Sequence, residues 1–310
     1  MNIKKELINF KNNNPWVLWI WNEYRRIKGN IEFKKISDKE YTKKLYFNAF
    51  GKYPDLDNPK TFNEKIQWMK LNYKNKNITQ LSDKYEVRQY IEEKGYGYLL
   101  NDLIAVYDFV DDINIDELPN KFVLKACHGS GWNLIVKNKD KIKWTPWKLV
   151  MKSWMKQNLY YYGREWNYKD IKPRIICEKF LEDNYGELRD YKIFCFNGEP
   201  KIIQVDVGRF TNHCRNVYDC EWNMLPLKLG YENYNGNVEK PINLVKMLDI
   251  AKDLSKELIH VRVDFYEVKE RLYFGELTFF HESGTSAFVP NKYDKIIGDY
   301  LELPNENYCL

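Results

Sequence analysis

The sequence predicts an α+β fold whose first third is mainly helical. Three observations support this prediction. Residues 1 to about 50 have the pattern of charged helices that carry aromatic side chains. From about residue 103 this pattern changes to short β-rich runs separated by turns. Between residues 243 and 258 the apolar residues return to the spacing of one helical face. Helices and strands therefore occupy distinct stretches of the chain, as they do in α+β proteins.

The first third contains a turn-rich connection and two further helix starts. The connection, GKYPDLDNPKTFNEK, is rich in Gly, Pro, Asp and Asn. Thr61 precedes Glu64 by three residues, a capping-box pattern that predicts a helix over QWMK. Another helix is expected to begin at Asp83, because Glu86 follows three residues later and Val87 opens an apolar helical pattern.

Three β-rich runs follow, namely LIAVYDF, KFVLKAC and NLIVK. The second and third flank a loop of small residues that contains Gly129 and Gly131. Such a loop lets backbone N–H groups approach an anion closely, as in loops that cradle phosphates. Lys125 lies inside the second run and has two interpretations: a lysine whose head reaches water along an apolar surface, or a phosphate ligand.

The second half of the chain predicts two antiparallel hairpins with a helix between them. A helical stretch, WKLVMKSWMKQNLYYYG, and a strand, PRIICEKFL, come first. Asn197 and Gly198 then join two strand-like runs, which is the strongest short-range hairpin signal. After the helix at 243–258, the runs HVRVDFY and RLYFGELTFF flank a polar turn and form the last hairpin.

The last hairpin carries acidic side chains in apolar surroundings. Asp264 and Glu276 would each be costly to bury without a partner. If the turn is tight, both carboxylates lie on one face of the sheet together with Thr278. These oxygen-bearing side chains suit a hard cation such as Mg²⁺. The alternative is that the acids pair with lysines and arginines of the strands.

Composition argues against several classes of protein. The 310 residues include 49 basic and 44 acidic side chains, so the net charge of +5 is spread over a mixed surface. Nucleic-acid binding is not expected, because no run interleaves arginines with stacking aromatics. The six cysteines are scattered and three lie in strand-like runs, which indicates a reducing cytoplasm rather than disulfides. A zinc site at His213, Cys214 and Cys220 is not expected, because a second pair of ligands is missing.

The N-terminal segment has two interpretations. Its start, MNIKKELINFKNNN, lacks the apolar stretch of a signal peptide, so we expect a cytoplasmic protein. The run WVLWIW, from Trp16 to Trp21, is too short to span a membrane. Beside Arg25, Arg26 and Lys28 it could rest peripherally in the interface at the inner face of a membrane, or it could belong to a helix docked on the protein itself.

Several stretches between about residues 45 and 303 carry a family resemblance. They are NPKTFNEKIQWMKL, LSDKYEVRQYI, FVLKACHGSGWN, EWNYKDIKPRIICEKFLED, LRDYKIFCFNGEP, VRVDFYEV and LYFGELTFFHESG. Their order resembles the ATP-grasp superfamily, and their residues are similar to its TupA-like branch, which is linked to teichuronopeptide and surface-polysaccharide synthesis. The resemblance implies two α+β lobes that clamp ATP, preceded by an N-terminal region.

The resemblance also implies an ATP site. Lys84 and Lys125 are similar to lysines that contact the phosphates, and Asp190 is similar to the acid that binds the ribose. Lys192 is a further candidate for phosphate or substrate. The mobile loop over the phosphates would be Gly129, Ser130 and Gly131, and the hinge that meets adenine would be Glu178, Lys179, Phe180 and Leu181.

The same resemblance assigns roles to residues in and after the last hairpin. Asp264 and Glu276 are similar to the Mg²⁺ ligands, and Arg262 is similar to an arginine that steadies charge on the transferring phosphoryl group. Thr278 stands where many ATP-grasp enzymes have Asn, which leaves open whether one or two Mg²⁺ ions bind. The residues expected to hold substrate are His281, Ser283 and Gly284.

These assignments give an expected domain organisation. The expected limits are an N-terminal helical extension at 1–50, a helical region before the ATP-grasp lobes at 51–102, lobe A with the glycine loop at 103–181, lobe B with the Mg²⁺ site at 182–303, and a tail at 304–310.

The resemblance implies an ATP-dependent carboxylate–amine ligase that forms an amide through an acyl phosphate. The carboxylate would belong to a glycan or sugar precursor, such as a uronic acid of a surface polysaccharide, and the amine to an amino acid or another amine. Two alternatives stay open: an ATP-dependent sugar or polyol kinase, and a glycosyltransferase or non-catalytic component of polysaccharide assembly.

Overall fold

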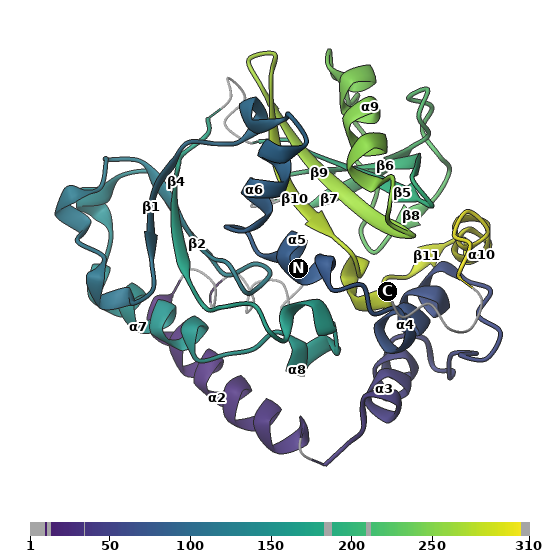
Figure 1. The fold of residues 1–310 in the computed structure, drawn as a ribbon, viewed down its shortest axis with the longest axis horizontal. Helices are drawn as coiled ribbons and strands as arrows, with labels where there is room; N and C mark the ends of the chain where they lie inside the picture. The colour runs from purple at the N-terminus through teal and green to yellow at the C-terminus, as the bar shows by residue number, and fades with distance from the viewer. Residues whose placement is uncertain (1–9, 11–13, 34, 183–187, 209–211, 305–310) are drawn as a thin grey trace. The chain divides into compact units, whose positions relative to one another are not determined.

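The structure is a computed structural model that describes residues 10, 14–33, 35–182, 188–208 and 212–304. The chain divides into two compact units (Figure 1). Unit 1 comprises residues 1–37, 83–86 and 101–180, and unit 2 comprises residues 38–82, 87–100 and 181–310. The chain therefore passes between the units several times, and the domain limits expected from the sequence stay a prediction.

Unit 1 is built on a four-stranded antiparallel sheet with the strand order β1-β4-β2-β3. Each of the four runs predicted to be strands in this part of the chain forms one. In β2 the side chains alternate between buried and half-buried, which is the pattern of a strand with one face on a core. The strands are β1 (Leu103–Tyr107), β2 (Phe122–Ala126), β3 (Asn133–Val136) and β4 (Ile175–Lys179).

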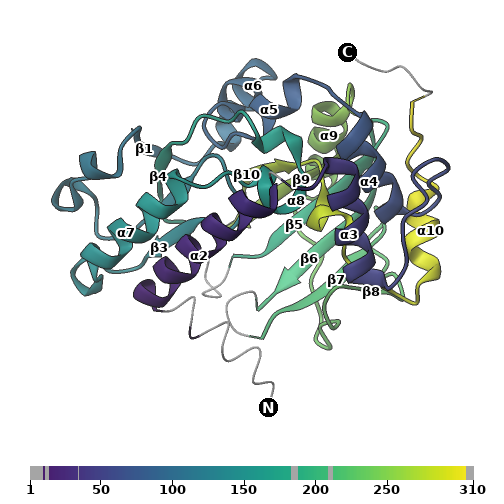
Figure 2. The same cartoon turned by 90° about the horizontal axis from the view of Figure 1, so that it is seen from below.

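Helices α2 (Pro15–Phe33) and α7 (Trp144–Met155) lie side by side in unit 1 (Figure 2). Leu18 and Trp19 of α2 pack against a core that includes the buried side chains of α7 and of the sheet. The helical stretch predicted after residue 147 is interrupted, so that α8 (Tyr160–Gly163) is separate. The other short elements of unit 1 are the 3₁₀ helices η2 (Val110–Asp112), η3 (Ile115–Glu117), η4 (Lys139–Lys141) and η5 (Trp166–Tyr168).

Unit 2 contains a five-stranded antiparallel sheet with the order β10-β9-β5-β6-β7. Both predicted hairpins are present in it. Asn197 and Gly198 adopt positive φ angles of 49° and 82° at the turn between β5 and β6, as their residue types favour. The strands are β5 (Asp190–Phe196), β6 (Glu199–Val207), β7 (Cys214–Tyr218), β9 (His260–Val268) and β10 (Arg271–Thr278), with a separate pair formed by β8 (Lys228–Leu229) and β11 (Phe288–Val289).

Helix α9 (Leu244–Ser255) packs on the face of this sheet formed by β5, β6 and β9 (Figure 1). Thr61 and Glu64 form the predicted capping box at the start of α4 (Phe62–Asn72). The remaining helices of unit 2 are α3 (Asp38–Phe50), α5 (Asn77–Ser82), α6 (Val87–Glu93), α10 (Lys292–Gly298), η1 (Gly97–Leu99) and η6 (His281–Gly284). In the part of the chain that the structure describes, every helix is too short or too polar to cross a membrane.

The helix expected to begin at Asp83 begins instead at Val87. The Asp83 carboxylate accepts hydrogen bonds from the backbone N–H groups of Tyr85 and Glu86, at 2.8 and 3.3 Å. It therefore caps a turn, and residues 83–86 belong to unit 1 although α5 and α6 on either side belong to unit 2. The prediction was wrong because the same side-chain pattern can cap a turn as well as a helix.

Candidate nucleotide and metal site

Lys125 and Glu178 form a close ion pair within the unit 1 sheet. Lys125 lies on β2 and Glu178 on the neighbouring strand β4, and the Lys125 Nζ donates to Glu178 Oε2 at 2.6 Å. Glu178 is almost completely buried, whereas the lysine head is partly accessible. The ammonium group is thus fixed at the surface of the sheet, where it can still meet an anion.

Lys84 is held beside the glycine loop. Its Nζ donates to the backbone carbonyl oxygen of Gly129 at 2.7 Å. Arg174, the residue before β4, holds the segment that carries Lys84: its Nη2 lies 2.7 Å from both Asp83 Oδ2 and Glu86 Oε1. Unit 1 therefore places Lys84 against the loop that follows Lys125 in the chain, and the predicted roles of these residues at a phosphate site stay a prediction.

The conformation of the glycine loop requires its small residues. Gly131 has a φ of +71°, in the region that favours glycine. A Cβ on Gly129 would lie 2.1 Å from the ring of Trp132, so a larger residue would push this ring away. His128 is buried before the loop, and one ring nitrogen lies 2.9 Å from the carbonyl oxygen of Trp154. The loop conformation thus depends on its two glycines and on the rings of His128 and Trp132 next to them.

The predicted hinge begins at the end of β4. The backbone N–H of Lys179 donates to the carbonyl oxygen of Asp102 at 3.0 Å, and its carbonyl oxygen accepts from the Asn101 side chain at 2.8 Å. The Lys179 head pairs at the surface with the Asp102 carboxylate. Phe180 is the last residue of unit 1, and the ammonium groups of Lys121 and Lys137 lie about 6 Å from the centroid of its ring. Leu181 already belongs to unit 2.

In unit 2, the Arg262 guanidinium is surrounded by the predicted metal ligands. Its Nε and Nη2 donate to the two Asp264 carboxylate oxygens at 2.6 and 2.7 Å. Nη2 also lies 3.0 Å from Thr278 Oγ1 and 3.4 Å from Glu276 Oε1. The register explains this cluster, because Glu276 lies opposite Asp264 and Thr278 opposite Arg262 across β9 and β10.

This cluster fits the chemistry of a magnesium ion. Asp264, Glu276 and Thr278 direct carboxylate and hydroxyl oxygens at one cationic group, and hard oxygen donors are the ligands that Mg²⁺ prefers. Within the described ranges, no three His, Cys, Asp or Glu side chains are grouped so as to hold a metal ion. A metal at this cluster would accordingly use two acids and the threonine hydroxyl.

Lys192 connects this cluster to further acids on the same sheet face. Its Nζ lies 2.8 Å from Asp190, 3.5 Å from Asp264 and 3.7 Å from Asp206. Burial raises the pKa of Asp264, against the opposing effect of the nearby Arg262 and Lys192 charges. The two cations thus counteract part of the effect of burial on the Asp264 carboxylate.

Asp206 and Arg215 extend the charged face and were missed by the sequence analysis. Burial alone would raise the pKa of Asp206, but the His213 ring, 3.2 Å away, and the charges of Arg215 and Lys192 hold it well below its usual range. Arg215 Nε lies 2.7 Å from Asp206, and its Nη1 lies 2.7 Å from Glu282. The alternation of Gln204 and Asp206 with valines along β6 was the available signal.

The predicted substrate residues lie in a strained turn. Glu282, Ser283 and Gly284 have consecutive positive φ angles of 43°, 57° and 67°. Helix α4 holds this turn in place: Lys70 Nζ donates to the Ser283 carbonyl oxygen at 3.0 Å, and Gln67 Nε2 donates to that of Gly284 at 2.7 Å. Strain of this kind persists only where the surroundings impose it, and it is common at functional sites.

His281 contacts Arg262 from this turn. Arg262 Nη1 lies 2.8 Å from His281 Nδ1, and burial together with the Arg262 and Arg215 charges holds the pKa of His281 well below its usual value. The imidazole is therefore neutral. The structure thus brings His281, Arg262, Asp264 and Lys192 together on unit 2, while the roles assigned to them stay predictions.

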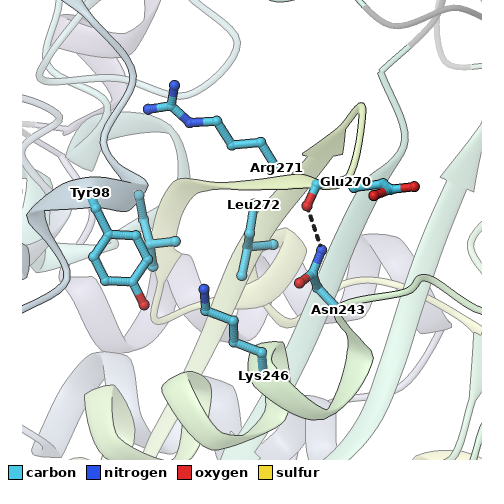
Figure 3. A pocket seen from close by; sticks show the side chains of 7 residues that line it. Tyr98, Asn243, Lys246, Glu270, Arg271 and Leu272 are labelled. Carbon is cyan, nitrogen blue, oxygen red and sulfur yellow. Dashed lines mark hydrogen bonds between the residues drawn. The ribbon is translucent and has the colours of Figure 1, made fainter.

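A separate hollow of about 270 Å³ lies at the far end of the β9–β10 hairpin (Figure 3). Its lining includes Tyr98, Lys246 and Arg271, and Asn243 donates to the backbone carbonyl of Glu270 at 2.8 Å. Arg271 precedes Glu276 by five residues on β10, which is roughly 17 Å along a strand. This hollow therefore contains none of the predicted site residues.

Comparison with known proteins identifies the family. The sequence model of the TupA-like ATP-grasp family matches residues 64–302. The chain therefore belongs to this family, and the α+β ATP-grasp fold predicted from the sequence is confirmed. No significant match to a curated protein is found.

Several solved ATP-grasp structures are similar at low identity. D-alanine–D-alanine ligase from Bacillus anthracis, complexed with ATP, is 16% identical over 64% of this chain and 53% of that chain, with a TM-score of 0.38. A RimK domain ATP-grasp protein from Sphaerobacter thermophilus is 12% identical over 72% and 68%, with a TM-score of 0.40. L-amino acid ligase from Bacillus licheniformis is 12% identical over 66% and 44%, also with a TM-score of 0.40. The chain spans about half the length of the D-alanine–D-alanine ligases that it matches.

Proposed function

We propose that the chain is an ATP-dependent carboxylate–amine ligase. The observation that carries this proposal is the cluster of Asp264, Glu276 and Thr278 around Arg262, in a chain that belongs to the TupA-like ATP-grasp family. The cluster can bind a cation and counter the negative charge of phosphates. Similar solved structures are named D-alanine–D-alanine ligase and L-amino acid ligase, which is consistent with the proposed reaction class.

In this proposal a carboxylate oxygen of the substrate attacks the γ-phosphorus of ATP, and the bond to ADP breaks. The product is an acyl phosphate. The amine nitrogen then attacks the acyl carbon, phosphate leaves with the electrons of the broken C–O bond, and the nitrogen loses a proton. A carboxylate needs this activation because its oxygen is otherwise a poor leaving group, and no covalent enzyme nucleophile is required.

The chain's own residues position and neutralise charge, which is most of what catalysis of phosphoryl transfer requires. Lys84 and Lys125 would hold phosphate oxygens, with the Gly129–Gly131 loop covering them, and Asp190 would bind the ribose. Arg262 and Lys192 would counter the charge on the moving phosphoryl group. Mg²⁺, held by Asp264, Glu276 and Thr278, would supply a further positive charge. The hinge would be Glu178, Lys179, Phe180 and Leu181, and the substrate residues would be His281, Ser283 and Gly284.

The proposed carboxylate is a uronic acid of a surface polysaccharide or of its precursor, and the proposed amine is an amino acid. The reaction would take place in the cytoplasm, where ATP is available. Support for an anionic substrate comes from the excess of five basic residues in the chain.

The test is ADP release from Mg·ATP by the purified protein. Glucuronic or galacturonic acid derivatives are offered with and without a mixture of amino acids. Release that requires both partners, with a product whose mass equals the sum of the two less water, is expected. Release with the sugar alone and a phosphorylated product would indicate a kinase, and failure to bind ATP would contradict the whole proposal.

A further inference from the structure

The outer face of α2 carries a stripe of exposed apolar side chains. Successive members are four, four, three and four residues apart, which places them on one face of the helix. Between 47% and 61% of each side chain is exposed. The members of this α2 stripe are Trp16, Ile20, Tyr24, Ile27 and Ile31.

The opposite face of α2 is the one that packs on the protein. It includes Asn22, which is buried and donates to Ser153 Oγ on α7 at 3.1 Å. The helix therefore turns a polar residue inward and a continuous apolar stripe outward. Contiguous apolar patches of this kind on a protein surface mark contacts with a partner.

The spacing of the α2 stripe is nearly the same in both directions. Read in antiparallel orientation, Trp16 lies opposite Ile31, Ile20 lies opposite Ile27, and Tyr24 lies close to its own copy. In a two-fold contact between identical chains, each pairing of two different residues occurs twice, once in each direction, so this spacing suits such a contact. The stripe is thus complementary to itself.

The charges along α2 disfavour an anionic lipid surface as the partner. Arg26 pairs with Glu23 at 2.7 Å and Lys28 lies 4.0 Å from Glu32, both within the helix. Arg25 lies over the ring of Tyr162, 4.3 Å from its centroid. Lipid-binding helices carry a polar face rich in unpaired lysines and arginines, whereas the bases of α2 are engaged within unit 1.

We propose that α2 packs antiparallel against α2 of a second copy of this chain through the α2 stripe. About half of five large side chains, at roughly 200 Å² each, gives about 500 Å² per copy and about 1,000 Å² for the pair. This is the lower limit for a specific interface.

Sedimentation velocity of the full chain over a concentration series tests the proposal. We expect a reversible shift from monomer to dimer that is lost in Ile20→Glu/Ile27→Glu. The matched control is Ile242→Glu/Val245→Glu, which places two charges on exposed apolar residues of unit 2 and should dimerise like the parent chain. A parent chain that stays monomeric at high concentration, or dimerisation retained in Ile20→Glu/Ile27→Glu, would overturn the proposal.

Cross-linking with a short bis-maleimide reagent tests the orientation. Tyr24→Cys should yield more covalent dimer than the parent chain, whose own cysteines set the background level. Ile31→Cys should not, because in an antiparallel pair its two copies lie roughly 20 Å apart along the helix axes. The reverse result would overturn antiparallel packing. If the chain is monomeric and sediments with phosphatidylglycerol vesicles, and Ile20→Glu/Ile27→Glu abolishes this sedimentation, the partner of the α2 stripe is a membrane and the proposed dimer is wrong.

Discussion

Replacing Arg174 by methionine should destabilise unit 1 and weaken ATP binding. The Arg174 Nη2 lies 2.7 Å from Asp83, whose side chain is 3% exposed. Breaking a buried ion pair by removing one partner costs about 3–5 kcal/mol, because the other charge stays buried. Asp83 keeps hydrogen bonds from two backbone N–H groups, and the more exposed Glu86 adds little. We therefore expect a loss of about 3 kcal/mol.

The same substitution should affect nucleotide binding because Arg174 anchors the segment that carries Lys84. A loss of about 3 kcal/mol corresponds to a fall in the unfolding midpoint of roughly 6–12 °C for a domain of this size, measurable by calorimetry. Release of Lys84 from its position beside Gly129 should weaken ATP binding about tenfold, or about 1.4 kcal/mol. Titration calorimetry with Mg·ATP measures this second effect.

Two variants separate this mechanism from a general loss of charge. Lys172→Met removes a surface ion pair with Asp108 and should change stability by less than about 1 kcal/mol. Asp83→Asn combined with Arg174→Met removes the unpaired buried charge and should recover part of the lost stability. An Arg174→Met protein with the parental unfolding midpoint and ATP affinity would refute the reasoning.

Three further outcomes are expected. Asp264→Asn should lower Mg²⁺-dependent ATP turnover at least about 100-fold while circular dichroism shows a retained fold, and undiminished turnover would remove Asp264 from the site. Lys70→Met loses hydrogen bonds to the Ser283 carbonyl and hydroxyl oxygens, so its affinity for the carboxylate substrate should fall more than its affinity for ATP, as measured by equilibrium binding. Equal losses of both affinities would show that the 281–284 turn does not bind the carboxylate substrate. The pKa of Asp206 is lowered in the folded state, so its contribution to stability is present above the unfolded value of about 3.9 and is lost as pH falls below it. Asp206→Asn should therefore be less stable at pH 7 and lose less stability between pH 7 and pH 3 in urea unfolding, and an unchanged pH dependence would contradict this assignment.

The features that the sequence predicted correctly depend on residues close together in the chain. Thr61 and Glu64 cap a helix three residues apart, and Asn197 with Gly198 turns a hairpin by its own backbone preferences. The opposition of Asp264 and Glu276 follows from a single short hairpin. Because neighbouring residues fix these geometries, the pattern of side chains was sufficient to predict them.

The features that the sequence did not predict depend on distant partners. Arg174 meets Asp83 across 91 residues of chain, and Lys70 meets Ser283 across 213. The helix expected at Asp83 was wrong for the same reason, since contacts with unit 1 hold residues 83–86 in a turn. No local pattern reports such contacts, although Lys70 does lie in a stretch, NPKTFNEKIQWMKL, that carries the family resemblance.

Burying the charged face of unit 2 costs free energy on folding, and this cost is relevant to the function of the face. The side chains of Asp190, Asp206 and Asp264 are each no more than 4% exposed, although each has a cation nearby. A buried ion pair contributes little beyond what well-packed apolar side chains would, so selection for stability alone would not favour this arrangement. Burial raises the pKa of Asp264, so its ionised form depends on Arg262 and Lys192. The ligand proposed for this sheet face, a metal-bound phosphate, carries both signs of charge and would therefore account for cations and carboxylates buried side by side.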